Sequence, residues 1–103
     1  MGTALLGDIL SDWSKYELDD SIYLPADTEA SLDLKVSVLP FDRTRKRIFE
    51  NQEYLLDIGQ VRDVIEGLEA QLNRTATLSE RLQAVVHYAQ YDSFIDPRDV
   101  TRE

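Results

Sequence analysis

The chain has 103 residues, no cysteine, and 20 Asp and Glu against 11 Lys and Arg, which gives a formal net charge of -9. The lack of cysteine excludes disulfides, thiolate metal sites and cysteine nucleophiles, and the charge disfavours nucleic acids and anionic membranes, which are normally bound by clustered Lys and Arg. The length and the apolar fraction of 43% predict one folded domain, residues 1–103, that prefers a basic protein as its partner.

The first part of the chain predicts one helix and one short strand. Thr3 is a candidate N-cap, and the residues after it place apolar side chains at helical spacing, at Leu6, Ile9, Leu10 and Trp13. Residues 21–24 are rich in strand formers, and Pro25 is expected to end that strand.

Two further strands are predicted in the middle of the chain. Apolar and polar residues alternate from Leu32 to Val38, which indicates a strand with one solvated face, and Pro40 follows it. A basic connection comes next, and residues 53–58 are expected to form a third strand that Gly59 ends.

Two helices complete the predicted order. The apolar stripe of the first runs from Val61 to Leu72, and Thr77 with Glu80 forms a capping box that starts the second near Leu78. The stripe of the second consists of Leu82, Val85, Val86 and Ala89. The order is therefore α-β-β-β-α-α, and the predicted fold is α+β, with a three-stranded antiparallel sheet packed against three helices.

Residues that could carry chemistry are few and scattered. His87 is the single histidine, and it lies with Gln83 and Gln90 on the helical wheel, which predicts a solvated side chain and not a base or a metal ligand. The serines lack the flanking glycines of a nucleophile elbow, and no acidic spacing matches a calcium loop. We therefore expect a protein that is not an enzyme, with no catalytic residue, cofactor-binding residue or metal site.

One segment opposes the acidic character of the chain. Residues 43–47 carry four positive charges, at Arg43, Arg45, Lys46 and Arg47. Such a cluster can grip phosphate, which would make a nucleic-acid-binding module. It can equally pair with the acids of this chain or of a second copy, and the net charge favours that alternative.

Binding to a protein has its own candidate residues. Tyr88 and Tyr91 are three residues apart on the last predicted helix, and tyrosines are enriched in the energetically dominant parts of interfaces. Six acids between the first helix and the start of the second predicted strand, residues 17–33, are the candidate electrostatic contacts: Glu17, Asp19, Asp20, Asp27, Glu29 and Asp33.

Three segments also resemble a family of small acidic bacterial proteins: LGDILSDW at 6–13, IYLP at 22–25 and YDSFID at 91–96. Some of these proteins are similar to the immunity proteins of contact-dependent growth inhibition and related polymorphic toxin systems. The resemblance implies binding to one cognate toxin domain, often a nuclease, and it brings no catalytic residues with it.

The sequence thus predicts a cytoplasmic immunity protein that neutralises a toxin, expected to be a nuclease, by covering its active site or substrate groove. No signal peptide or membrane span is recognisable, so no membrane partner is expected. The alternatives are a regulatory or scaffold module that self-associates, a nucleic-acid-binding module that uses residues 43–47, and a hydrolase. The oligomeric state is left open.

Overall fold

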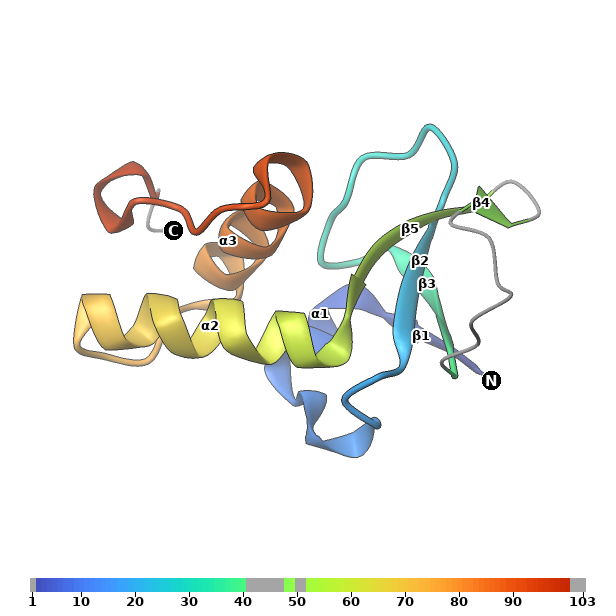
Figure 1. The fold of residues 1–103 in the computed structure, drawn as a ribbon, viewed down its shortest axis with the longest axis horizontal. Coiled ribbons are helices and arrows are strands. Elements are labelled where there is room, and N and C mark those ends of the chain that lie inside the picture. Colours follow the sequence, from blue (N-terminus) through green and yellow to red (C-terminus); the bar gives the residue numbers. More distant parts are fainter. Residues whose placement is uncertain (1, 41–47, 50–51, 101–103) are drawn as a thin grey trace.

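The computed structural model describes residues 2–40, 48–49 and 52–100, and within them the chain forms five strands and three α-helices (Figure 1). The chain also contains two short 3₁₀ helices, η1 and η2. The elements in chain order are β1 (Gly2–Leu5), α1 (Leu6–Ser11), η1 (Trp13–Lys15), β2 (Ser21–Pro25), β3 (Lys35–Leu39), β4 (Ile48–Phe49), β5 (Gln52–Asp57), α2 (Ile58–Leu72), α3 (Leu78–Tyr91) and η2 (Pro97–Asp99).

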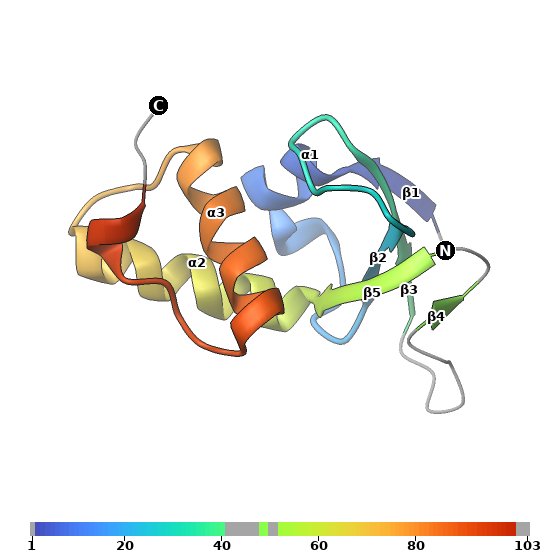
Figure 2. The ribbon, with the colours of Figure 1, turned by 90° about the horizontal axis from the view of Figure 1, so that it is seen from above.

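All strand pairings in the sheet are antiparallel, and the strand order is β1-β3-β2-β5-β4. The helices lie together on one face of the sheet (Figure 2). Val36 and Val38 of β3 and Ile22 of β2 point into the space between the two layers and are almost fully buried. Ser37 lies between the two valines, and its side chain accepts a hydrogen bond from Gln52 Nε2 on the opposite face of the sheet.

The predicted fold class is confirmed as α+β, with an antiparallel sheet and three helices, but the predicted element order is wrong. Thr3 does not cap a helix, because residues Gly2–Leu5 form strand β1 along β3. Helix α1 begins at Leu6 and has no side-chain cap. The backbone N–H groups of Leu6 and Gly7 instead donate to the carbonyls of Leu34 and Leu32, both at 2.9 Å, so a distant segment satisfies the start of this helix.

The second strand is shorter than the predicted range from Leu32 to Val38, and it begins three residues later. Leu32 and Asp33 form a turn, and β3 runs from Lys35 to Leu39. The turn packs closely against α1. A Cβ atom on Gly7 would lie 2.9 Å from the Leu32 carbonyl oxygen, which is too close for a side chain. Only glycine at position 7 allows this close approach.

The predicted third strand is confirmed with a shift, because β5 ends at Asp57 and Ile58 already belongs to α2. Gly59 does not break the strand. It lies in the first turn of α2, and its N–H donates to the Leu18 carbonyl at 2.8 Å. The short strand β4 pairs with β5, so the sheet has five strands and not three. The basic segment 43–47 lies outside the described residues.

The core lies between the sheet and the helices. The capping box at Thr77 and Glu80 is confirmed, and α3 begins at Leu78 as predicted. Its apolar stripe is only partly confirmed: Val85 is fully buried, whereas Ala89 is exposed and Val86 is only half-buried. The largest buried apolar side chains are Leu6, Ile9, Leu10, Ile22, Val36, Ile58, Val61, Val64, Ile65 and Val85. Among the described residues no helix has both the length and the apolar character needed to cross a membrane.

Candidate functional site

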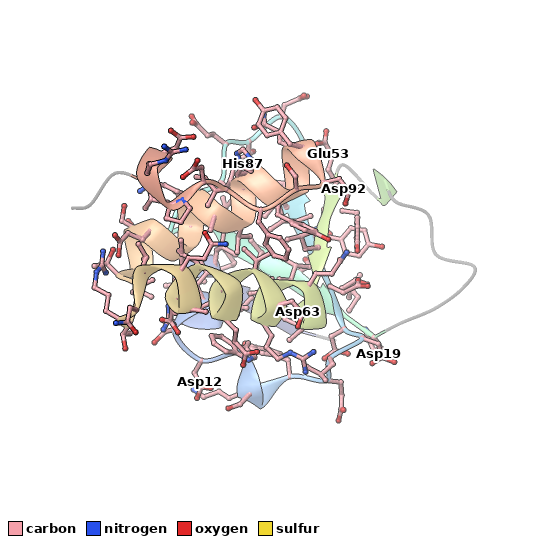
Figure 3. All side chains as sticks on the ribbon, turned by 60° about the vertical axis from the view of Figure 1, so that its left-hand side comes forward. Asp12, Asp19, Glu53, Asp63, His87 and Asp92 are labelled. Atoms are coloured by element: carbon pink, nitrogen blue, oxygen red, sulfur yellow. The ribbon has the colours of Figure 1, made fainter. Side chains whose placement is uncertain are left out.

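The six predicted acidic contacts fall into two groups along the chain. Three of them precede β2 and three follow it, so the two groups lie at opposite ends of that strand. Figure 3 shows Asp19 at the lower right of the molecule, and His87 and Asp92 in its upper half. The groups are Glu17, Asp19 and Asp20 before the strand, and Asp27, Glu29 and Asp33 after it.

The first group has a largely structural environment. The Asp20 carboxylate accepts a hydrogen bond from the Glu17 N–H at 3.1 Å, and the Asp20 carbonyl accepts from the N–H of Ile58 at 2.9 Å. Together with the Leu18 carbonyl, this segment satisfies the N–H groups at the start of α2. Glu17 and Asp19 are exposed, and Asp20 is half-buried.

The second group lies on the connection between β2 and β3, residues 26–34, which we call the acidic loop. Asp27, Glu29 and Asp33 are all exposed. The loop is fixed at its far end, where the carbonyls of Leu32 and Leu34 cap α1. The middle of the loop, at Glu29 and Ala30, lies beside α3.

An open groove with a volume of about 320 Å³ separates the acidic loop from α3. Its apolar floor comes from both sides of the groove and from the segment after α3, and its rim carries one carboxylate, two amides and an imidazole. The floor residues are Ala30, Leu82, Val86 and Ile95, and the rim residues are Glu29, Gln83, His87 and Gln90.

Aromatic side chains continue this surface along α3. The rings of His87 and Tyr91 lie 4.8 Å apart between centroids, and those of Tyr88 and Phe94 lie 5.4 Å apart. Tyr91 is 65% exposed and Phe94 is 56% exposed. The Phe94 ring lies against Gly67 on α2, whereas Tyr91 contacts His87 at the groove, and a large exposed aromatic side chain beside a groove is typical of protein interfaces.

The two predicted tyrosines therefore differ in their surroundings. Tyr88 is half-buried and packs against the core as well as on Phe94, whereas Tyr91 is exposed at the groove end of α3. His87, which the sequence predicted to be solvated, is half-buried and lines the groove. The spacing of His87 and Tyr91 at i and i+4 is the signal that could have indicated their contact.

A buried ion pair fixes the start of α3. Glu80 is 1% exposed, and its two carboxylate oxygens accept from Arg74 Nη1 and Nη2 at 2.8 and 2.7 Å. The Thr77 N–H also donates to Glu80 at 2.8 Å. The hydrogen bonds from Arg74, followed by those from Thr77, lower the pKa of Glu80 from 4.5 to about 2. Glu80 thus anchors the start of α3 as an ionised side chain.

A second ion pair joins all three helices. Arg81 on α3 donates to Glu69 Oε2 on α2 at 2.8 Å, and to the carbonyl of Leu10 on α1 at 2.6 Å. Its guanidinium carbon lies 5.6 Å from the centre of the Trp13 ring, within range of a cation–π contact. Together the two pairs hold α3 in a defined place, which also defines the groove wall that α3 supplies.

A further polar cluster lies at the start of α2. The Asp57 carboxylate accepts from the Ser21 hydroxyl at 2.8 Å and from the Tyr54 hydroxyl at 3.0 Å. The Asp57 N–H donates to Gln60 Oε1 at 3.0 Å. Asp57 is the N-cap residue of α2, and it forms a capping box with Gln60. These hydrogen bonds stabilise the junction of β5 and α2. Within the described part of the chain, no three His, Cys, Asp or Glu side chains converge as metal ligands.

Comparison with known proteins places residues 3–97 in a family described as a domain of unknown function, DUF7716, and the chain belongs to this family. The match covers the acidic loop, the groove and all three helices. No curated protein and no solved structure matches the chain.

Proposed function

We propose that this member of the family is a binding protein, not an enzyme, and that it neutralises a basic toxin domain in the cytoplasm. The observation that carries the proposal is the surface formed by the acidic loop, the groove and the exposed end of α3. It combines carboxylates, an apolar floor and the exposed ring of Tyr91, which contacts the His87 ring at the groove. Aromatic anchors with a polar rim are the usual composition of a protein interface.

A nuclease is the toxin class whose chemistry fits best. Its substrate groove must be positive to hold phosphate, so a protein with a net charge of -9 is attracted to it and can cover it. Complementary charge raises the association rate more than the final affinity. A fast association suits an inhibitor that must reach the toxin before the toxin reaches nucleic acid.

The task requires only part of the surface of the molecule. A standard interface covers about 800 Å² of each partner, which is about one eighth of the 6539 Å² that this chain exposes. We therefore assign the contact to Asp27, Glu29, Asp33 and Tyr91, which share the groove end of the fold. Glu17, Asp19 and Asp20 lie at the other end of β2 and are left out of this contact set, as is the half-buried Tyr88.

The test is co-expression with a candidate nuclease toxin domain, which is sought first in the genes beside this one. We expect the two proteins to co-elute in size-exclusion chromatography as one complex, and nuclease activity on nucleic acid to fall to background at equimolar inhibitor. The proposal is wrong if the purified proteins neither co-elute nor alter the cleavage rate. A concentration-dependent dimer of this chain alone, without such a complex, would support the self-associating scaffold instead.

Binding of nucleic acid by this chain would rest on residues 43–47, which lie outside the described residues, and it stays a prediction from the sequence. The same experiment addresses it, because a shift of labelled RNA or DNA by this chain in the absence of nuclease would favour that module.

A further inference from the structure

We propose that the groove between the acidic loop and α3 receives one arginine side chain of the partner protein, with Glu29 as the residue that pairs with its guanidinium. The inference rests on the proposed function and names the partner chemistry that the groove recognises. It is carried by three features around one open space: the Glu29 carboxylate, an apolar floor and the His87 ring, which contacts the ring of Tyr91.

The size and the lining of the groove suit a long side chain. Its volume of about 320 Å³ would hold about ten water molecules at about 30 Å³ each, which is far more than a methyl or isopropyl group fills. Ala30, Val86 and Ile95 provide apolar surface along which the methylene stem of such a side chain can lie. When the methylene stem lies on this apolar floor, the charged end of the side chain is left at the rim of the groove.

The charge of the rim selects a cation. Glu29 is the single carboxylate among the lining residues, and neither Lys nor Arg lines the groove. Within the described part of the chain, Glu29 has no hydrogen bond and no ion pair. An apolar occupant would cover this carboxylate without compensating its lost hydration, which is unfavourable. A cationic occupant removes that penalty.

The aromatic pair favours arginine over lysine. His87 lines the groove, and its ring contacts that of Tyr91, so two flat surfaces lie beside the rim. A guanidinium is planar and weakly hydrated, stacks on aromatic faces and forms two parallel hydrogen bonds with a carboxylate, whereas an ammonium does neither as well. The negative charges of Asp27 and Asp33 on the same loop add long-range attraction for the cation.

The test uses small probes and does not require the partner to be known. The uniformly ¹⁵N-labelled protein is titrated with N-acetyl-arginine amide at constant ionic strength, and the amide shifts of Ala30, Val86 and Gln90 are followed by NMR. N-acetyl-citrulline amide has nearly the same shape without the charge, and N-acetyl-lysine amide carries the charge without the planar group. We expect saturable shifts at the groove with the arginine probe, and weaker binding of both others.

Two variants and one control locate the interaction. Glu29→Gln should weaken binding of the arginine probe by about two- to five-fold, the range expected for one exposed ion pair. Val86→Ser should weaken binding of all three probes, because it removes apolar floor. Glu66→Gln makes the same charge change at an exposed site on α2 that does not line the groove, and it should leave binding unchanged.

Equal binding of the citrulline and arginine probes would overturn the proposal, as would equal binding of the lysine probe or an unchanged affinity in Glu29→Gln. Shifts confined to residues outside the groove would also overturn it. This test can fail independently of the proposed function. A toxin complex can form although the arginine probe does not bind, and the probe can bind although no toxin complex forms.

Discussion

Replacing Glu80 by glutamine tests how the structure holds α3 against the rest of the fold. Glu80 is almost fully buried and forms two hydrogen bonds with the Arg74 guanidinium. Glutamine keeps the size of the side chain and one oxygen that can accept from the Thr77 N–H. The substitution therefore removes the ion pair while it preserves most of the capping box.

The expected loss of stability is about 2 kcal/mol, because hydrogen bonds to charged groups contribute about 1.5–3 kcal/mol. It lies below the 3–5 kcal/mol typical of a fully buried broken pair, because Arg74 is 33% exposed and its freed guanidinium can be hydrated. A loss of this size lowers the melting temperature of a domain of about 100 residues by about 8–16 °C. Urea unfolding followed by the fluorescence of the single tryptophan, Trp13, measures it directly.

The effect should also depend on pH in a defined direction. The folded-state pKa of Glu80 is lowered from 4.5 to about 2, so its ionised form stabilises the fold fully above pH 4.5. That contribution is lost as the pH falls from 4.5 towards 2. The stability difference between the parent and Glu80→Gln should shrink over this interval. A difference that stays constant across it, or one below about 0.5 kcal/mol at neutral pH as for an ordinary surface change, would refute the reasoning.

Three further substitutions test the local geometry by thermal or urea unfolding. Thr77→Ala should cost about 1 kcal/mol by removing the hydroxyl that caps α3, and an unchanged midpoint would mean that the cap is not important. Gly67→Ala should stabilise by up to about 1 kcal/mol, because the new methyl group would meet only the Phe94 ring, at 3.7 Å, in ordinary contact; a loss of stability would contradict this. Gly7→Ala should destabilise by about 1–3 kcal/mol, because its methyl group would collide with the Leu32 carbonyl, and a neutral result would place the acidic loop differently.

Local signals in the sequence were sufficient for the helices α2 and α3. The stripe from Val61 to Leu72 and the capping box at Thr77 and Glu80 act within a few residues of one another, so their outcome hardly depends on the rest of the fold. The strand β5 was predictable to within one residue for the same reason.

The N-terminal strand could not be predicted in this way. Residues Gly2–Leu5 show no strong strand pattern, and they form β1 because β3 supplies backbone partners from another part of the chain. The start of α1 likewise depends on the carbonyls of Leu32 and Leu34 and not on its own cap residue. Tertiary contacts therefore determine both the strand β1 and the start of α1. A prediction from the local pattern alone, which began the helix after Thr3, does not include these contacts.

The candidate site was predictable only in part. Glu29 and Tyr91 were expected contacts, and the structure places them at the same end of the molecule. The groove itself was not expected, because it depends on how the acidic loop approaches α3, and that approach follows from the long-range contact between Gly7 and Leu32. His87 was missed for the same reason, since its partial burial needs the loop and the Tyr91 ring.

The most direct test of the central claim compares charge reversal at the two ends of β2 in stopped-flow association with the toxin domain that the co-expression test identifies. One variant carries Glu29→Lys and Asp33→Lys, and the other carries Glu17→Lys and Asp19→Lys, so both change the charge by the same amount. Asp27 is kept, because its φ of 59° suits Asp better than Lys.

We expect the loop variant to associate at least about tenfold more slowly than the parent, and the other variant to stay within about twofold of it. Added salt should slow the parent and reduce the difference, because screening shortens the range of the attraction. Equal slowing of both variants, or an unchanged rate in the loop variant, would contradict the assignment of the acidic loop and groove as the binding surface.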